Sequence, residues 1–197
     1  MSTTTAPMSL RTARAVAAEM VEALRPYCHR VAVAGSIRRG RDWINDIEIV
    51  AIPKSTVRQP DVDIFGEPMG KAVTVRDPGF VMVVDSLANH IVKGKVSDGR
   101  YVQFFTGDGV KVDLFMCQPE TWGYIMAIRT GSSDFSRALA MRWVQLGYKG
   151  MEGQLTRFGK PVPTPEEADL FDLLHMAVPA PHQRELTTEW LKPWIRK

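Results

Sequence analysis

The chain has 197 residues, of which 45% are hydrophobic and 24% charged, a composition typical of a globular protein and unlike that of a disordered or fibrous chain. Two cysteines are too few for a disulfide framework, and no cysteine or histidine cluster has the spacing of zinc ligands. No apolar run reaches the length of a membrane span, and the first residues lack a signal-peptide pattern, so we expect a cytoplasmic protein. The net charge of +3 is a weak indication of a polyanionic partner.

The first half of the chain alternates helical and strand patterns. Residues 1–8 are polar and poorly patterned, and we expect them to be disordered. Apolar residues then recur at helical spacing after Ser9, a favourable N-cap residue. The patterns predict, in chain order, a helix over 10–24, strands over 30–34 and 46–52, a long connection over 55–78 with a short hairpin, and a helix over 80–90.

The second half begins with strands and ends with helices. The patterns predict strands over 91–96, 101–106 and 110–117, helices over 119–129 and 133–146, a hairpin over 151–158, and a helix that starts within 164–167 and ends near 176. The segment TGDG at 106–109 is typical of a hairpin turn, and Ser132 is a favourable N-cap. Because the strands carry hairpin signals, we expect a mixed sheet with helices on one face rather than a doubly wound parallel sheet.

A glycine–serine pair after the strand over 30–34 is the first feature with chemical meaning. Gly35 allows a backbone to approach a bulky anion, and the Ser36 hydroxyl together with free N–H groups can bind phosphate oxygens. Arg38 and Arg39 follow at once, and a guanidinium can donate two hydrogen bonds to one phosphate. The segment therefore predicts phosphate binding.

Three carboxylates stand on two predicted strands. Asp46 lies ten residues after Ser36, and Glu48 lies two further on. The two acids therefore face the same side of a strand about 7 Å apart. Neighbouring carboxylates repel, so the alternatives are a magnesium or manganese site and a solvated surface pair. Asp113 interrupts an apolar strand, either as a third metal ligand or as a salt-bridged acid. Together the three could hold two metal ions that activate an attacking hydroxyl and stabilise a departing phosphate.

Cations outnumber acids from 129 to 160, which is either a solvated basic face or a surface that follows phosphates. The cations are Arg129, Arg137, Arg142, Lys149, Arg157 and Lys160, against Asp134 and Glu152. A further acidic pair, Asp61 and Asp63, lies in a connection rich in proline and glycine with no glycine–serine pair before it. We therefore assign this pair no metal role.

Several segments resemble a known family. GSIRRG, DIE and VDLF occur in the order and spacing of the polymerase beta superfamily of nucleotidyltransferases. The segments ETWGYIMAIRTGSSDFSRALAMRWVQLGYKGMEGQL and PVPTPEEADLFDLL resemble family X DNA polymerases in particular, and the resemblance covers about 10–176. It implies a minimal form of the family, with an α/β (α+β) nucleotidyltransferase palm over 1–128 and a small α+β lobe over 129–197 that contacts nucleotide and DNA.

The resemblance also implies roles for individual residues. Asp46, Glu48 and Asp113 match the metal-binding catalytic carboxylates, and Asp113 would help to activate the primer hydroxyl. The residues matched to or placed beside the bound nucleotide are Gly35, Ser36, Arg39, Arg129, Thr130, Gly131 and Ser136. The candidates for DNA contact in the basic segment are Arg137, Arg142, Lys149 and Arg157.

Four positions depart from the family pattern. Glu48 stands where the family usually has Asp, and Arg129 replaces an aromatic residue beside the nucleotide sugar. Ser136 replaces an Asn that contacts the base in many relatives, and Ala140 replaces an Arg that touches the template side of the new pair. The last two departures weaken the expectation of accurate template reading.

The motifs and the resemblance together lead us to expect a metal-dependent DNA polymerase. It would add a deoxynucleoside monophosphate from a dNTP to a DNA 3′ hydroxyl and release pyrophosphate, with two Mg²⁺ or Mn²⁺ ions as cofactors, in gap-filling DNA repair. The expected partners are primer–template, gapped or nicked DNA and a dNTP, with no membrane, and we expect a monomer. The alternatives are a nucleotidyltransferase that acts on RNA, protein or a small molecule, and a catalytically inactive DNA-binding relative.

Overall fold

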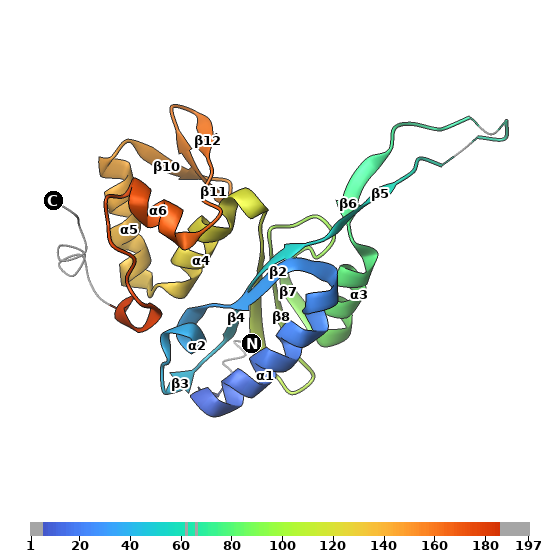
Figure 1. The fold of residues 1–197 in the computed structure, drawn as a ribbon. Coiled ribbons are helices and arrows are strands. Elements are labelled where there is room, and N and C mark those ends of the chain that lie inside the picture. The colour runs from blue at the N-terminus through green and yellow to red at the C-terminus, as the bar shows by residue number, and fades with distance from the viewer. Residues whose placement is uncertain (1–5, 62, 66, 186–197) are drawn as a thin grey trace.

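A five-stranded mixed sheet lies at the centre of the protein (Figure 1). The computed structural model describes residues 6–61, 63–65 and 67–185. In sheet order the strands are β2 (Cys28–Val33), β4 (Ile47–Pro53), β9 (Lys111–Met116), β8 (Tyr101–Phe105) and β7 (His90–Gly94). β4 and β9 run parallel, and every other neighbouring pair in this sheet is antiparallel, so the predicted mixed sheet is confirmed.

Two helices cover one face of this sheet. α1 (Leu10–Leu24) carries apolar residues at helical spacing, and the Ser9 hydroxyl caps it by accepting a hydrogen bond from the Thr12 N–H. α3 (Pro78–Leu87) lies beside α1, and the Asp77 side chain caps it. The helices and the sheet bury one apolar core, which includes Ala13, Ala17, Phe80, Val84, Ile47 and Val102.

The opposite face of the sheet is partly covered by a third helix, α4 (Trp122–Thr130), which follows the 3-10 turn η2 (Pro119–Thr121). Strand side chains alternate between faces, so Val50 and Phe115 point away from the first core and pack near Trp122. Helices therefore lie on both faces, whereas we expected them on one. The reason is that β4 and β9 also carry apolar side chains on this face. Val50 and Phe115 come two residues after Glu48 and Asp113 in their strands, and α4 covers them.

The C-terminal part has an apolar core of its own. α4 contributes Tyr124 and Ala127 to this core, so the helix connects the sheet to the C-terminal part. The other elements are α5 (Ser133–Gln145), the antiparallel strands β10 (Tyr148–Met151), β11 (Gln154–Arg157) and β12 (Lys160–Val162), α6 (Glu167–Leu173) and the 3-10 turn η3 (Pro181–Gln183). Ser132 caps α5 as predicted. The boundary predicted at residue 128 stays a prediction. Within the described ranges, no helix has the length and apolarity needed to cross a membrane.

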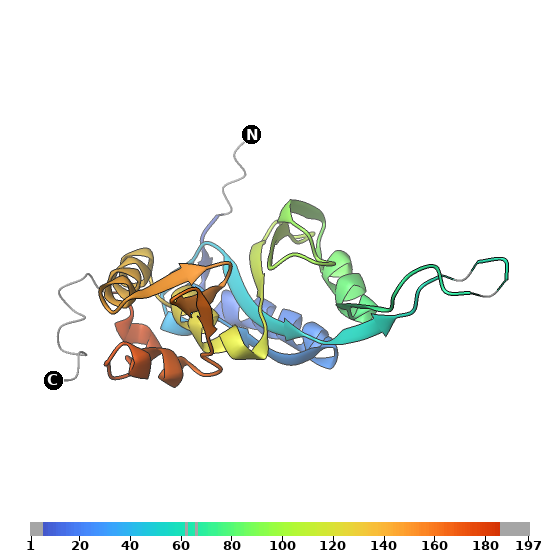
Figure 2. The ribbon, with the colours of Figure 1, turned by 90° about the horizontal axis from the view of Figure 1, so that it is seen from above.

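A two-stranded arm projects from the sheet on the side away from the C-terminal part (Figures 1 and 2). Its strands β5 (Ser55–Arg58) and β6 (Val73–Arg76) pair antiparallel, as expected for a hairpin in this connection. Beyond them, Ile64 and Phe65 are exposed and Asp63 accepts hydrogen bonds from the backbone, so this acid closes a turn of the arm.

Three local features differ from the sequence predictions. Gly35–Arg39 forms a helix, α2, which is too short to show a helical period. Met8 pairs with Ile44, so it is not part of a disordered tail; residues 1–5 lie outside the described residues. α6 starts at Glu167, within the predicted 164–167, but it ends three residues earlier than the predicted 176, because the chain turns after Leu173. The remaining small elements are β1 (Met8–Ser9), η1 (Arg25–Tyr27) and β3 (Trp43–Ile44).

Candidate active site

The three carboxylates singled out in the sequence come from neighbouring strands and lie on one face of the sheet. Glu48 on β4 and Asp113 on β9 are directly opposite in the parallel pairing. Neighbouring strands lie about 4.8 Å apart, so the two side chains project side by side. Asp46 immediately precedes β4, and Lys111 Nζ lies 3.0 Å from Asp46 Oδ2 and 3.5 Å from Asp113 Oδ2. One ammonium group therefore already bridges two of the three acids.

The crowding of acids changes the protonation of Glu48. Burial and then the neighbouring charge of Asp46 raise the pKa of the Glu48 carboxyl to about 7, and Asp113 adds to the same effect. Arg129 and Arg39 act in the opposite direction without cancelling it. Near neutral pH, Glu48 is thus divided between its neutral and charged forms, and an added cation would favour the charged form.

Two residues of β8 hold Asp113. The Tyr101 hydroxyl donates a hydrogen bond to Asp113 Oδ1 over 2.5 Å, and Gln103 Nε2 donates to the same oxygen over 2.7 Å. Burial raises the pKa of Tyr101, and its hydrogen bond to Asp113 adds to the rise, so the phenol remains a donor. Sequence reasoning missed both residues. The available signal was the pair of polar side chains at alternate positions of an otherwise apolar strand.

The glycine–serine pair opens α2 beside Glu48. Gly35 has φ of +61°, and a Cβ atom at this position would collide with the Glu48 carboxylate. The Ser36 Oγ is buried and has no hydrogen-bond partner among the described residues. A buried hydroxyl without a partner costs free energy, so this site can gain from a ligand oxygen or a water molecule. The structure thus brings the predicted phosphate-binding pair next to the predicted carboxylates.

The two arginines of α2 reach across to the C-terminal part. Arg39 donates from Nε to Glu185 over 2.5 Å and from Nη1 to the Thr130 carbonyl over 2.8 Å. A guanidinium has five N–H donors, so Arg39 keeps donors for a phosphate. Arg38 donates to the Thr130 hydroxyl and to Glu167, and so does not extend towards the carboxylates.

Glu167 is the centre of a charged network between α2 and the end of the described chain. It accepts hydrogen bonds from Arg38 and from Arg184, whose side chain is 1% exposed. Burial opposes the ionisation of Glu167, but its hydrogen bonds to the two arginines outweigh burial and hold its pKa below the ordinary value. The network is a buried connection between the sheet and the C-terminal part, and the sequence analysis did not predict it.

The residues matched to the nucleotide sugar and base lie around the end of α4. Arg129 places its guanidinium 3.9 Å from the centre of the Phe115 ring, and its Nε is buried with no partner among the described residues. Thr130 is buried and Gly131 follows it as the C-cap, with Phe135 close against Gly131. Ser136 donates its hydroxyl to the Ile128 carbonyl over 2.8 Å, so this hydroxyl is already used within the C-terminal part.

The four candidates for DNA contact occupy different situations in the C-terminal part. Arg142 donates from Nε to the Leu174 carbonyl over 3.1 Å and so helps to hold α5 to α6. Arg137 is exposed and makes a weak pair with Asp134 on the same helix. Lys149 is exposed on β10, and Arg157 on β11 lies over the rings of Tyr148 and Phe158. Their contact with DNA stays a prediction.

The three carboxylates have the ligand chemistry that a hard divalent cation requires, but their oxygens do not converge on one point. Carboxylate oxygens are the ligands that Mg²⁺ and Mn²⁺ prefer, and the Lys111 contacts show that Asp46 and Asp113 can share one cation. Across the described ranges, however, no three Asp, Glu, His or Cys side chains form a group that could hold a metal ion as they stand. Metal binding would therefore require Lys111 and the Glu48 carboxylate to reorient.

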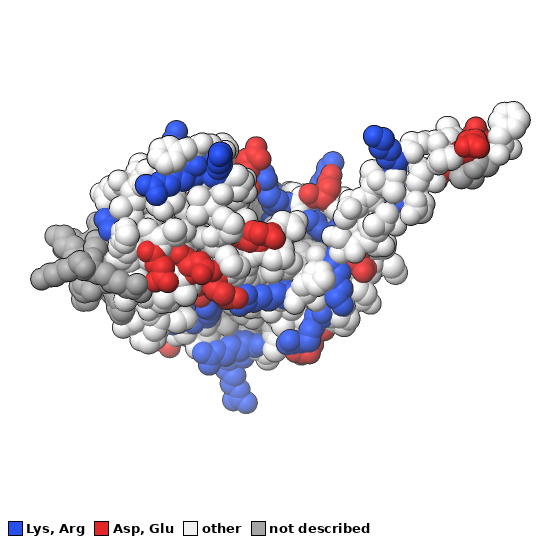
Figure 3. All heavy atoms as spheres, turned by 45° about the horizontal axis from the view of Figure 1, so that its top comes forward, with Lys and Arg blue, Asp and Glu red and all other residues white. Residues whose placement is uncertain are grey.

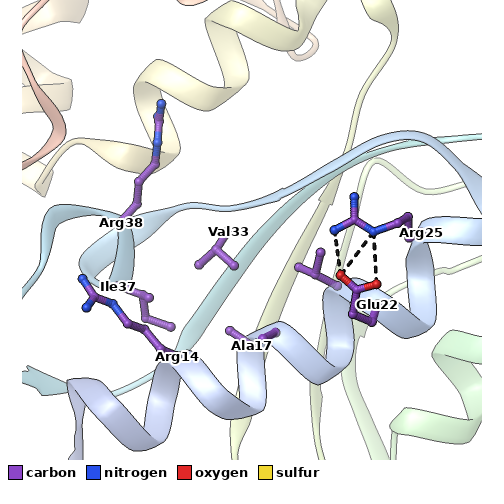
Figure 4. A pocket seen from close by; sticks show the side chains of 9 residues that line it. Arg14, Ala17, Glu22, Arg25, Val33, Ile37 and Arg38 are labelled. Carbon is purple, nitrogen blue, oxygen red and sulfur yellow. Dashed lines mark hydrogen bonds and ion pairs between the residues drawn. The ribbon is translucent and has the colours of Figure 1, made fainter.

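Two hollows lie near these elements. A pocket of about 420 Å³ between α1 and α2 is lined by Arg14, Ala17 and Ile37, while Arg38 extends from it towards α4 (Figure 4). It contains none of the three carboxylates and takes no part in the site. A larger cleft of about 1010 Å³ lies along Tyr101 and Arg129 and adjoins the site through the Tyr101 hydroxyl.

Comparison with known proteins bears on the C-terminal part. Residues 126–185 match the family described as DNA polymerase beta thumb. A comparison with curated proteins finds no match. The matched segment begins within α4 and includes Thr130, the cap of α5, and the Glu167–Arg184 pair. This similarity relates the C-terminal part to the DNA polymerases of that family in general, and it leaves the sheet and its carboxylates outside the matched segment.

Proposed function

We propose that this protein is a nucleotidyltransferase that adds a deoxynucleoside monophosphate from a dNTP to a DNA 3′ hydroxyl. The observation that carries the proposal is the meeting of Asp46, Glu48 and Asp113 on one face of the sheet, beside Gly35 and Ser36. A segment similar to a DNA polymerase thumb lies next to this face. Acids alone would fit many enzymes, and the adjoining thumb-like part favours DNA as the substrate.

Asp46, Glu48 and Asp113 would hold one or two Mg²⁺ or Mn²⁺ ions. When bound, such ions supply positive charge to an attacking oxygen and to a departing phosphate. The raised pKa of Glu48 supports this assignment, because three neighbouring acids, of which Asp113 is buried, lack enough cationic charge of their own. Lys111 supplies part of that charge in the absence of a metal ion.

The protein's own residues would then position the reactants. The Ser36 hydroxyl and the backbone of α2 would bind phosphate oxygens, and the free donors of Arg39 would bind the far end of the triphosphate. Asp113 Oδ1 accepts hydrogen bonds from Tyr101 and Gln103, so Oδ2, which lies 3.5 Å from Lys111 Nζ, would be the oxygen that accepts the proton of the 3′ hydroxyl. The 3′ oxygen forms a bond to the α-phosphorus, the bond from this phosphorus to the bridging oxygen breaks, and pyrophosphate leaves with both electrons of that bond.

The setting that we propose is the filling of short gaps in DNA. The described part of the C-terminal segment is small, and its basic residues Arg137, Lys149 and Arg157 lie at the surface or against aromatic rings. A small basic surface holds a short length of duplex rather than a long one. The monomeric state and the cytoplasmic location expected from the sequence remain part of the same proposal.

The test is an extension assay with labelled nucleic acids. A primer–template, a one-nucleotide gapped duplex, a single strand and an RNA primer are each offered with the four dNTPs in Mg²⁺ or Mn²⁺. We expect extension of the gapped duplex, and Asp113→Asn should reduce turnover at least a hundredfold, about 3 kcal/mol of barrier. Asp85→Asn, on the exposed side of α3, is the matched control and should change nothing.

The other outcomes are equally informative. Transfer to RNA, to a protein or to a small molecule without extension of DNA would replace the DNA substrate in this proposal. Near-normal turnover by Asp113→Asn would remove the carboxylates from the mechanism. DNA binding without turnover in either metal would identify a catalytically inactive relative.

A further inference from the structure

A large cleft opens between the base of the arm and the turn that joins β10 to β11. Its volume is about 1010 Å³, and its floor is formed by β8 and β9 on the same face as the carboxylates. Tyr101 belongs both to this floor and to the set of residues that holds Asp113. The cleft therefore adjoins the candidate active site through Tyr101, although neither the motifs nor the family match indicated it.

Basic side chains from separate parts of the chain meet around the cleft. Arg58 comes from the arm, Arg100 from the residue before β8, and Arg129 from the end of α4. Arg76 also lines it but donates its hydrogen bonds to backbone carbonyls, so it serves the fold. Figure 3 shows charged side chains around the hollow beside the arm.

The other three arginines, Arg58, Arg100 and Arg129, have N–H groups that could bind an anion. Arg58 is exposed and makes no ion pair with any described residue. Arg100 lies 3.8 Å from Glu152, but both side chains are more than 60% exposed, at 63% and 69%, so the pair is weak. The Arg129 Nε has no partner in the described part of the chain. Four arginines against Asp98 and Glu152 leave the lining positive.

The shape of the lining favours a nucleotide chain over a simple anion. Tyr101 and Phe115 stack with ring centres 5.0 Å apart, and Arg129 covers Phe115, so a planar guanidinium forms part of the wall. Planar arginine groups and aromatic rings stack with unpaired bases, and neighbouring arginines bind the phosphates between them. The cleft volume is at the upper end of the roughly 300–1,000 Å³ of small-molecule pockets. The rings and the guanidinium plane in the lining favour a single strand, because the bases of a duplex are already paired and stacked on one another.

We propose that this cleft binds a single-stranded segment of nucleic acid next to the carboxylates, with Arg58 and Arg100 on its phosphates and Arg129 against a base. The proposal rests on the proposed function only in taking the strand to be part of the enzyme's substrate. Binding in the cleft needs no catalysis, so the two proposals can fail separately.

The experiment measures fluorescence anisotropy of labelled oligonucleotides over a range of salt concentrations. The probes are a single-stranded DNA, a single-stranded RNA of the same sequence and a blunt DNA duplex. The double variant Arg58→Ala/Arg100→Ala should bind the single strand about tenfold more weakly. The slope of log affinity against log salt should fall by about 1.4, since each lost contact to a single strand accounts for about 0.7. The control is Arg11→Ala/Arg14→Ala, which removes two exposed arginines of α1 on the other side of the sheet and should leave both values unchanged.

A photo-crosslink locates the strand. An oligonucleotide with 4-thiothymidine should crosslink to peptides that contain 97–101 or 152–154, which line the cleft. Crosslinks only to α1, or an unchanged salt slope in the cleft double variant, would overturn the proposal. An equal loss of affinity for the blunt duplex would also overturn it. Comparison of the DNA and RNA probes decides which nucleic acid the cleft takes.

Two further measurements separate this proposal from the proposed function. Asp113→Asn should bind the single strand as tightly as the parent protein, because Asp113 does not line the cleft and is not one of the residues proposed to contact the strand. If no DNA is extended but the cleft double variant loses affinity as expected, the cleft stands and the polymerase activity does not. If DNA is extended normally by that variant at low DNA concentration and its affinity is unchanged, the cleft proposal is wrong.

Discussion

Replacement of Glu48 by glutamine should change how the stability of the metal-free protein depends on pH. Burial and the negative charges of Asp46 and Asp113 raise the pKa of Glu48 from 4.5 to about 7, because they outweigh the opposite effect of the nearby arginines. Between these pH values the folded protein binds a proton that the unfolded chain does not bind. Stability from this group is therefore complete below pH 4.5 and is lost as the pH rises through 7. At about 1.4 kcal/mol for each pH unit, the loss is on the order of 3 kcal/mol.

Glutamine keeps the size of the side chain but cannot ionise. We therefore expect Glu48→Gln and the parent protein to have similar free energies of unfolding at low pH, and the variant to be more stable by on the order of 3 kcal/mol above pH 7. Urea unfolding over this pH range, in a chelating buffer, measures the difference. Glu19→Gln on the exposed side of α1 controls for the chemical change itself.

Magnesium should raise the stability of the parent protein at high pH, where the ionised Glu48 lowers it. A metal ion that binds only the folded protein stabilises it by about 2.7 kcal/mol at a hundred times its dissociation constant. The parent protein should gain this stability at pH 8, and Glu48→Gln should gain less. The reasoning would be refuted if the difference between parent and variant stayed constant from pH 5 to 8 without metal.

Three other substitutions test neighbouring parts of the site. Gly35→Ala should destabilise the protein by about 1–3 kcal/mol and lower turnover, because φ is +61° there and the added Cβ meets a carboxylate; an unchanged melting temperature would contradict this. Glu167→Gln should lower the free energy of unfolding by about 3–5 kcal/mol, because it leaves the nearly inaccessible Arg184 without a counter-charge; urea unfolding gives the value, and a loss below 1 kcal/mol would show that the network contributes little. Tyr101→Phe removes one donor from Asp113 Oδ1 and should lower kcat about tenfold with little change in KM for the dNTP, as steady-state kinetics would show; a change in KM alone would mean that Tyr101 binds substrate rather than positioning the acid.

Local patterns were sufficient for most of the helices and strands. The helix over 10–24 follows from its apolar spacing and from Ser9, and its bounds agree with α1. The site strands follow from alternation, because Asp113 stands between two apolar residues and must face away from the core. By contrast, α2 has five residues, too few to show the periodicity of a helix. Its helical conformation could therefore be identified only from the structure.

The contacts within the site depended on strand pairing. Gln103 and Tyr101 reach Asp113 because β8 lies next to β9 with Gln103 opposite Asp113. A shift of one residue in this register would turn both donors to the opposite face. The same limit applies to Lys111, whose ammonium reaches Asp46 only because β9 lies parallel to β4.

The sequence by itself determined which residues are acidic, basic or apolar on each face of each strand, and thus which side chains were able to form a site. Only the tertiary structure decided their partners. Arg142, whose contact with DNA stays a prediction, donates a hydrogen bond to the Leu174 carbonyl, and Arg58 and Arg100 line a cleft that no motif indicated. The physical reason is that side-chain type and periodicity act over a few residues, whereas hydrogen bonds and ion pairs act over a few ångströms between segments that the fold alone brings together.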